Sequence, residues 1–307
     1  MMHYITTNPL FKKITWEMTN YCNYKCSYCN AECNSGSVPL PKDYDHIIRL
    51  VENFRDNQPL IFDIMGGEPT LWSKFKDFCI ALKNTSYKNT HIVFSTNASR
   101  TMRWWKTFDA PISDLGLSFH PEEASVEHFV DVLKEIHYKY NVTVYLMCPP
   151  KCYEKSIELF KKIEEVQLVV RAMLKPVMDW SSGSKGYVDG YTEKLLLTIS
   201  KSKYKHKDCK RSTISQTLYY NGKESNVRDI INKKQNQFKG WFCNLGQNHL
   251  YIKADGRIYG SACGIKESLL GSLNNYKIKN GPVICSNLWC TCGSDIEIEK
   301  WKCNTVE

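Results

Sequence analysis

Strand-like and helix-like segments alternate along the chain from residue 14 to about residue 175. The strand-like segments are short, rich in β-branched and aromatic residues, and bounded by polar residues, glycine or proline. They comprise residues 13–19, 59–65, 91–96, 114–119, 142–147 and 166–174. Apolar residues recur at helical spacing between them. Six such units in series predict parallel strands with right-handed crossovers, either as an open doubly wound sheet or as a full or partial barrel.

The pattern changes after Pro176. A Gly/Ser-rich link covers residues 179–190, a basic run covers 201–211, and hairpin turns are predicted at Asn221-Gly222 and Asp255-Gly256. We therefore predict three regions: a core at 1–176, a linker with a basic and hairpin segment at 177–240, and a small cysteine-rich, hairpin-containing domain at 241–307. So small a domain would be stabilised by a bound metal.

Fourteen cysteines occur in this chain of 307 residues, of which 42% are hydrophobic. No apolar run reaches the ~18 residues of a membrane span, and the N-terminal residues lack the apolar stretch of a secretion signal. We expect a cytoplasmic protein. Because thiols stay reduced in that compartment, the clustered cysteines indicate metal ligation rather than disulfides.

Cys22, Cys26 and Cys29 lie in the loop that follows the first predicted strand. Three thiolates suit zinc or an iron–sulfur cluster. A structural zinc site normally has four ligands, and Cys33 or His46 could supply the fourth. A [4Fe-4S] cluster held by three cysteines instead leaves one iron open to another ligand.

The spacing Cys-x3-Cys-x2-Cys, together with MGGEPTL at 65–71, resembles radical S-adenosylmethionine (SAM) enzymes. The resemblance covers residues 14–175 and implies an α/β fold, a partial (β/α)6 TIM-like barrel. It also implies that SAM binds the open iron and is cleaved reductively, and that the resulting 5′-deoxyadenosyl radical takes a hydrogen atom from the substrate. The residues that it places near SAM are Tyr28, Gly66, Gly67, Glu68, Ser95, Asn97, Ser118 and Arg171. The two glycines would let the ligand approach where a Cβ would block it.

The C-terminal cysteines resemble those of SPASM and twitch domains, which bind auxiliary [4Fe-4S] clusters. The first choice of ligands is Cys243, Cys263, Cys290 and Cys292, with Cys285 as an alternate and Cys303 further along the chain. These cysteines suffice for one auxiliary cluster rather than two. Structural zinc is the alternative.

Such a cluster could accept the electron that a dehydrogenation or a cross-link leaves on the substrate. The resemblance therefore implies oxidative modification of a peptide or protein side chain, or of a sugar-like metabolite. A radical epimerase would instead need a thiol hydrogen donor, for which Cys148 and Cys152 are candidates. A third possibility is a non-catalytic zinc protein that binds a partner.

The resemblance further implies an electron donor such as flavodoxin or ferredoxin. The formal net charge of +9 and the basic run 201–211 suit a phosphorylated or nucleotide-linked substrate, although a solvated loop explains the same run. No RNA-binding motif supports a nucleic-acid partner, and no membrane partner is expected.

Overall fold

A computed structural model describes residues 3–8, 10–29, 35–54, 57–87, 89–179, 187–209, 212, 214, 216–290 and 292–302. Within these residues, two β-sheets form the framework, one of eleven strands and one of six. Cys33 and Cys303, which the sequence offers as possible ligands, lie outside the described residues. Among the described helices, none is long and apolar enough to cross a membrane.

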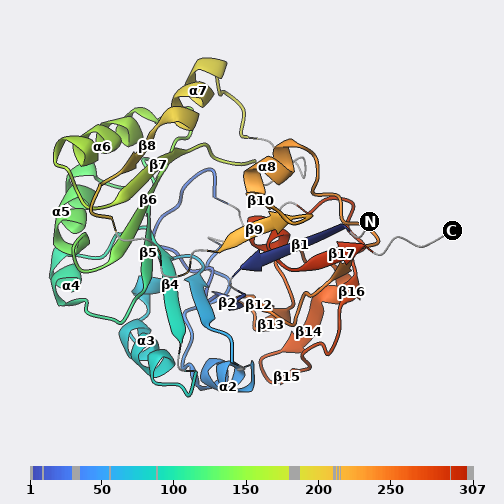
Figure 1. Cartoon of the computed structure of the whole chain (residues 1–307). Coiled ribbons are helices and arrows are strands. Elements are labelled where there is room, and N and C mark those ends of the chain that lie inside the picture. The colour runs from blue at the N-terminus through green and yellow to red at the C-terminus, as the bar shows by residue number, and fades with distance from the viewer. Residues whose placement is uncertain are drawn as a thin grey trace.

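Six consecutive parallel strands form the centre of the larger sheet. They are β2 (Lys12–Glu17), β3 (Leu60–Met65), β4 (Thr90–Thr96), β5 (Asp114–Phe119), β6 (Asn141–Met147) and β7 (Arg171–Lys175). The crossovers between them carry α2 (Asp45–Phe54), α3 (Phe75–Lys83), α4 (Met102–Thr107), α5 (Val126–Ile136) and α6 (Glu154–Glu165). Figure 1 shows these helices along the outer side of the curved sheet. The predicted α/β fold, a partial (β/α)6 barrel, is confirmed.

The large sheet continues beyond these strands at both edges. At one edge, β8 (Lys203–Lys205), reached through α7 (Glu193–Lys201), pairs antiparallel with β7. At the other edge, β12 (His249–Ile252) pairs parallel with β2. Beyond it follow β13 (Arg257–Tyr259), β14 (Leu269–Ser272) and β15 (Asn275–Tyr276). The hairpin predicted at Asp255-Gly256 is confirmed, since β12 and β13 flank it, and it extends the barrel sheet.

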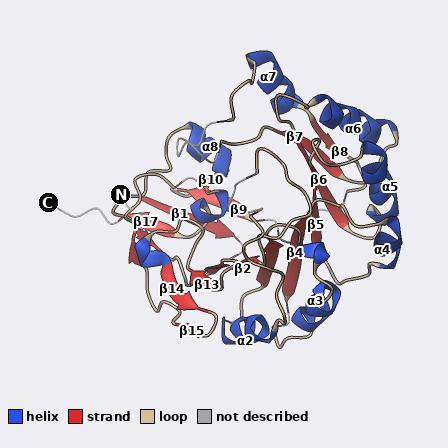
Figure 2. Cartoon of the chain, turned by 180° about the vertical axis from the view of Figure 1, so that it is seen from behind, coloured by secondary structure: helices blue, strands red, loops and turns tan. Residues whose placement is uncertain are grey.

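The smaller sheet joins the two ends of the chain. Its strands are β10 (Lys223–Ser225), β9 (Thr217–Tyr220), β1 (His3–Asn8), β17 (Lys300–Lys302), β11 (Phe242–Cys243) and β16 (Val283–Ile284), in this order. Three short helical segments accompany this part of the chain: α8 (Val227–Asn232), η2 (Lys266–Ser268) and α9 (Gly293–Ile296). Figure 2 shows the smaller sheet beside the barrel, on the side away from α4 to α6. The domain boundaries at 176 and 240 stay a prediction, but strand pairing crosses both.

Alternate residues of the barrel strands face opposite sides of the sheet. On β6, Val144 and Leu146 are fully buried in the main apolar core, which the sheet shares with the outer helices. Tyr145 and Met147, between and after them, are only partly buried. They lie on the concave side, which is therefore the side available to ligands.

Candidate active site

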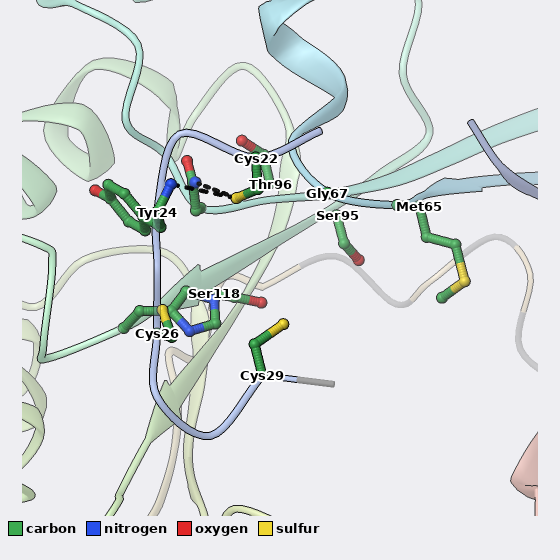
Figure 3. A pocket seen from close by; sticks show the side chains of 12 residues that line it. Cys22, Tyr24, Cys26, Cys29, Met65, Gly67, Ser95, Thr96 and Ser118 are labelled. Carbon is green, nitrogen blue, oxygen red and sulfur yellow. Dashed lines mark hydrogen bonds between the residues drawn. The ribbon is translucent and has the colours of Figure 1, made fainter. Parts of the chain in front are cut away.

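A cavity of about 210 Å³ lies at the carboxyl ends of β2, β3, β4 and β5. It is lined by Cys22, Tyr24, Cys26, Cys29, Met65, Gly66, Gly67, Ser95, Thr96, Asn97, Ser118 and His120 (Figure 3). The structure thus brings together the cysteine triplet, the Gly-Gly turn and the three polar residues expected near SAM. Binding sites of parallel β/α folds form at this end of the strands, because the loops that follow the strands converge there.

The cysteine loop follows β2 and presents its three thiols to the cavity to different degrees. Cys26 is buried, Cys22 is half-buried and Cys29 is exposed. Burial raises the pKa of Cys26 to about 12 and, more weakly, that of Cys22. The amide of Asn97 lies 3.8 Å from the Cys22 sulfur. Three cysteine sulfurs beside one cavity form a donor set that fits an iron–sulfur cluster, and a bound cation would favour the thiolate form that burial disfavours.

Two glutamates that follow β5 hold the cysteine loop in place. Glu122 accepts hydrogen bonds from both the backbone amide and the hydroxyl of Ser27, each at 2.6 Å. Glu123 accepts a hydrogen bond of 3.1 Å from the backbone amide of Lys25. The sequence analysis does not predict this role; the only signal for it is the position of the Glu-Glu pair directly after LSFHP at the end of a strand. Residues 95 and 98 positions apart thereby fix the conformation of one loop.

The Gly-Gly turn after β3 packs directly against the backbone of the cysteine loop. A Cβ on Gly67 would lie 2.1 Å from the carbonyl oxygen of Tyr21, and one on Gly66, whose φ is +144°, would lie 2.4 Å from that of Thr19. The amide of Gly67 donates to the Thr19 carbonyl at 2.7 Å. The glycines line the cavity, as expected, but the close approach that requires them in this structure is that of protein backbone.

Glu68 is not among the described residues that line the cavity, and its expected position close to SAM stays a prediction. Its carboxylate is fully buried and accepts hydrogen bonds from the hydroxyls of Thr70 and Thr96, at 2.6 and 2.7 Å. It also accepts from the backbone amides of Thr70 and Asn97, at 3.0 and 2.6 Å. Burial raises the pKa of Glu68, while these donors act in the opposite direction. Glu68 therefore ties the Gly-Gly turn to the end of β4 and positions Asn97.

Tyr28, the aromatic residue expected near SAM, lies behind His120 rather than in the cavity lining. Its hydroxyl and Nδ1 of His120 are hydrogen-bonded at 3.0 Å, and the two rings stack with their centroids 6.0 Å apart. Burial lowers the pKa of His120 to about 4, so its imidazole is neutral at pH 7. The aromatic ring that lines the cavity is that of Tyr24, four residues earlier.

Three further residues lie away from the cavity. Arg171 is at the amino end of β7, where its guanidinium donates to the Asn141 side chain at 3.0 Å. Cys148 is fully buried in the main core rather than facing the cavity, and Cys152 is half-buried in the next loop. None of the three is among the described residues that line the cavity. Arg171 thus lies at the end of its strand away from the cavity, and Cys148 lies in the apolar core, so their expected roles in SAM binding and hydrogen donation stay predictions.

The C-terminal cysteines form a second group, and most of them are buried. Cys243 lies on β11, and Cys285 and Cys290 are held by backbone hydrogen bonds to Trp241 and Asn236. Burial raises the pKa of Cys290 to about 12, and the charges of Cys243 and Cys263 add to this effect. Burial also raises the pKa of Cys285, and the charge of Cys263 makes a smaller contribution in the same direction.

Cys292, a first-choice ligand, is placed differently. It precedes α9, and its sulfur lies 3.7 Å from the Ser294 hydroxyl. Cys285, the alternate, is buried, whereas Cys292 is half-buried. Among the residues that the structure describes, no three His, Cys, Asp or Glu side chains meet as ligands of a single ion would.

A buried lysine lies opposite Cys243. Lys300 on β17 is directly paired with Cys243 on β11, and its side chain is 2% exposed. Its ammonium group donates to the carbonyls of Asp295 and Ile298 at 2.6 and 2.7 Å, and lies 5.0 Å from the centre of the Phe238 ring. A buried cation is stabilised by nearby negative charge, so Lys300 suits thiolates that hold an anionic metal centre.

Comparison with known proteins identifies several similarities. The family model described as the radical SAM superfamily matches residues 16–174, more than half of the chain. A SAM-dependent nucleotide dehydratase from Thermoplasmatales archaeon strain ISO4-H5 is 23% identical over 108 residues, 35% of this chain and 37% of that protein. An AdoMet-dependent heme synthase from Nitratidesulfovibrio vulgaris is 33% identical over 64 residues, 21% of this chain and 17% of that protein. Both matches thus span well under half of these relatives.

Solved structures share the fold at low sequence identity. The protein anSMEcpe with bound AdoMet and Kp18Cys peptide has a TM-score of 0.55 and 17% identity, covering 85% of this chain and 77% of that one. SuiB of Streptococcus suis bound to the precursor peptide SuiA has a TM-score of 0.54 and 14% identity, covering 87% and 63%. AdoMet is also bound in another structure of SuiB. At these identities the likeness concerns the fold.

Proposed function

Because the chain belongs to the radical SAM superfamily, whose enzymes use SAM and a [4Fe-4S] cluster, we propose that Cys22, Cys26 and Cys29 hold this cluster and that the enzyme oxidatively modifies a peptide or protein side chain. The observation that carries this proposal is the cavity at the carboxyl ends of β2 to β5. It joins the three thiols to the Gly-Gly turn and to the polar ends of β4 and β5.

The residues of the chain would bind and orient SAM rather than react with it. When bound, the cluster and SAM supply a 5′-deoxyadenosyl radical, formed by reductive cleavage of SAM, which removes a hydrogen atom from the substrate. Backbone groups of Gly66 and Gly67, together with the side chains of Ser95, Asn97 and Ser118, offer hydrogen bonds to the polar groups of SAM.

Three side chains outside the cavity would fix this geometry. Glu68 holds the backbone amide of Asn97, and Glu122 and Glu123 hold the cysteine loop at Ser27 and Lys25. Rigid placement is effective in radical chemistry, because a small displacement of the reacting carbon exposes other hydrogen atoms to attack.

We further propose that the C-terminal cysteines bind one auxiliary [4Fe-4S] cluster, with Cys243, Cys263, Cys285 and Cys290 as ligands. A dehydrogenation or a cross-link removes a second electron and a proton from the substrate after the first hydrogen atom, and the electron needs an acceptor. A cluster at this position would accept it, and a flavodoxin or ferredoxin would supply the electron used to cleave SAM. The buried Lys300 supports an anionic centre here.

A peptide substrate is supported by the solved structures of similar fold that contain bound peptides. Small-molecule substrates are the competing expectation, since the curated relatives are a nucleotide dehydratase and a heme synthase. No observation favours an epimerase, because neither Cys148 nor Cys152 is among the described residues that line the cavity.

The test is SAM cleavage by the full chain. Protein reconstituted anaerobically with iron and sulfide should release 5′-deoxyadenosine from SAM when dithionite is added, even without substrate. Cys209→Ala, which changes a half-buried cysteine outside both groups, should release it at the same rate. Absence of 5′-deoxyadenosine from the reconstituted wild-type protein would contradict the proposal.

A further inference from the structure

The SAM cavity covers only part of the concave side of the barrel. Its lining comes from β2, β3, β4 and β5 and from the loops that follow them. The concave side of β6, β7 and β8 lies beside it, at the upper left of Figure 1. When one part of a substrate reacts in the cavity, the rest of that substrate can contact this neighbouring surface.

One transverse row of residues leads across the sheet from the cavity to this surface. Ser118, which lines the cavity, is paired with Tyr145, Tyr145 with Met173, and Met173 with Lys203. Directly paired residues of neighbouring strands point to the same side of a sheet, and neighbouring strands are about 4.8 Å apart. Lys203 therefore lies on the concave side, roughly 14 Å from Ser118.

Lys175 lies on the same side, two residues beyond Met173 at the carboxyl end of β7. It is partly buried, and its ammonium group lies 5.6 Å from the centre of the Tyr145 ring. It is paired with Met147 on β6, so it is two strand spacings from β5, roughly 10 Å. The ring of Tyr145 in turn extends toward Gly116 on β5: its Cε2 atom would be 3.5 Å from a Cβ there.

Lys175 and Lys203 take part in none of the ion pairs found among the described residues. Burial lowers the pKa of Lys175, and the charges of Arg228 and Lys203 lower it further. Near the other edge of the parallel strands, by contrast, Lys13 is paired with Asp63 at 3.5 Å. Two lysines on the concave side that form no ion pair with any described residue favour an anionic ligand.

We propose that Lys175 and Lys203 form a subsite for a carboxylate of the substrate peptide, so that the enzyme acts on a side chain close to a glutamate or aspartate. This proposal rests on the proposed function, since it assumes a peptide substrate. The separation of roughly 10 to 14 Å from the cavity corresponds to about three or four residues of extended peptide, at 3.3 Å per residue. Tyr145 and Met173 would contact the chain between the two sites.

The test is binding of short fluorescent peptides to the reconstituted full chain with SAM, measured by anisotropy. A peptide with glutamates should bind more tightly than its counterpart with lysines, and added salt should weaken its binding. Lys175→Met and Lys203→Met should each weaken binding of the glutamate peptide about tenfold, because each removes a charged partner. Lys161→Met, which removes an exposed lysine from the outer helix α6, should leave it unchanged.

Equal binding of the acidic and basic peptides, or unchanged binding in both lysine variants, would overturn the proposal. It would also be overturned if inorganic phosphate bound at Lys175 while the glutamate peptide did not. Lys203 is exposed on an edge strand, so its substitution should not disturb folding, and the iron content reports whether each variant is intact. Release of 5′-deoxyadenosine is measured separately. Absence of 5′-deoxyadenosine from the reconstituted wild-type protein would contradict the proposed function. Release of 5′-deoxyadenosine without binding of the acidic peptide would contradict the subsite alone.

Discussion

The two groups of cysteines in this chain differ in their solvent exposure and in the residues that surround them. In the barrel, Cys29 is exposed and the triplet borders a cavity of about 210 Å³. In the C-terminal region, Cys243, Cys285 and Cys290 are all buried, and the cation of Lys300 lies beside Cys243. An open group can take an exchangeable ligand, whereas a closed group is suited to a permanently ligated centre. The comparison leads us to expect SAM chemistry at the first group and electron transfer or structural support at the second.

The largest effect is expected when one group of cysteines is removed and the other is kept. The triple variant Cys22→Ala, Cys26→Ala and Cys29→Ala should lose SAM cleavage entirely, yet keep about four irons and a brown colour from the second cluster. A colourless triple variant that binds one zinc would refute the auxiliary cluster, and with it the argument for an oxidative reaction. The measurements are iron and zinc content, visible absorbance and release of 5′-deoxyadenosine.

The converse variant, Cys243→Ala with Cys290→Ala, should keep the iron of the barrel. It should also destabilise the C-terminal region by several kcal/mol, because metal binding contributes directly to the folding free energy of small metal sites. Susceptibility of residues 241–302 to proteolysis would report this loss. Equal stability of the double variant and the wild type would show that the second group binds no metal.

Gly67→Val should lower both the SAM affinity and the iron content of the barrel site. Substitution of a residue that contacts only SAM would lower the SAM affinity alone. A side chain there collides with the backbone of Tyr21, next to Cys22, so the cysteine loop must move. Both SAM affinity, by calorimetry, and the iron content of the barrel should fall, the latter from about eight to about four per chain if both clusters are present. Gly281→Val, where a Cβ would meet nothing within 4 Å, is the matched control. Normal iron content with weakened SAM binding would mean that the loop tolerates the side chain.

Lys300→Met should lower the free energy of unfolding by about 2–4 kcal/mol. The change removes the Lys300 donor from the carbonyls of Asp295, Ile296 and Ile298, and a buried carbonyl left without any donor costs about 1–3 kcal/mol. It should also shift the reduction potential of the C-terminal cluster to a more negative value, because a nearby positive charge is lost. Lys302→Met, an exposed residue of the same strand, should change neither quantity in urea unfolding and redox titration. An unchanged reduction potential would show that the charge of Lys300 does not act on the cluster.

The smallest effect concerns the junction of the two regions, where His249 of β12 contacts both. Its Nε2 lies 3.3 Å from the Thr15 hydroxyl of β2, and its Nδ1 lies 3.9 Å from the Asp295 carboxylate. Burial, with smaller contributions from Lys13 and Lys300, lowers the pKa of His249 to about 3. The unfolded chain takes up a proton below about pH 6.5 while the folded chain does not, so stability falls as the pH falls.

Between pH 7 and pH 5 this effect amounts to about 2 kcal/mol, at about 1.4 kcal/mol per pH unit below 6.5. Burial also raises the pKa of Asp295, which acts in the opposite direction at low pH and reduces the net loss. Urea unfolding of wild type and His249→Gln at the two pH values isolates the histidine contribution. The exposed His46→Gln variant should keep the wild-type dependence. Identical slopes for wild type and His249→Gln would contradict the assignment.

The local sequence pattern predicts the bounds of a strand well where the signal for that strand lies within one short segment. The predicted segment 114–119 coincides with β5, and the predicted segment 142–147 differs from β6 by one residue, because alternating apolar residues and the turns beside them fix both. The segment 166–174 was less accurate: β7 begins only at Arg171, after a turn in which Gln167 has a φ of +54°. The first strand, at residues 3–8, was not predicted, since its partners are about 210 and 295 residues away.

The sequence by itself determined the repeated β/α units, the cysteine triplet and the Gly-Gly turn, because each depends on residues close together in the chain. Only the tertiary structure decided which neighbours these residues have. It placed Glu68 behind the cavity, Tyr28 against His120 and Lys300 opposite Cys243. It also set the row from Ser118 to Lys203, which depends on the register of four strands. The physical reason is that the direction of a side chain follows from local backbone periodicity, whereas its contacts depend on segments that the fold brings together from far apart.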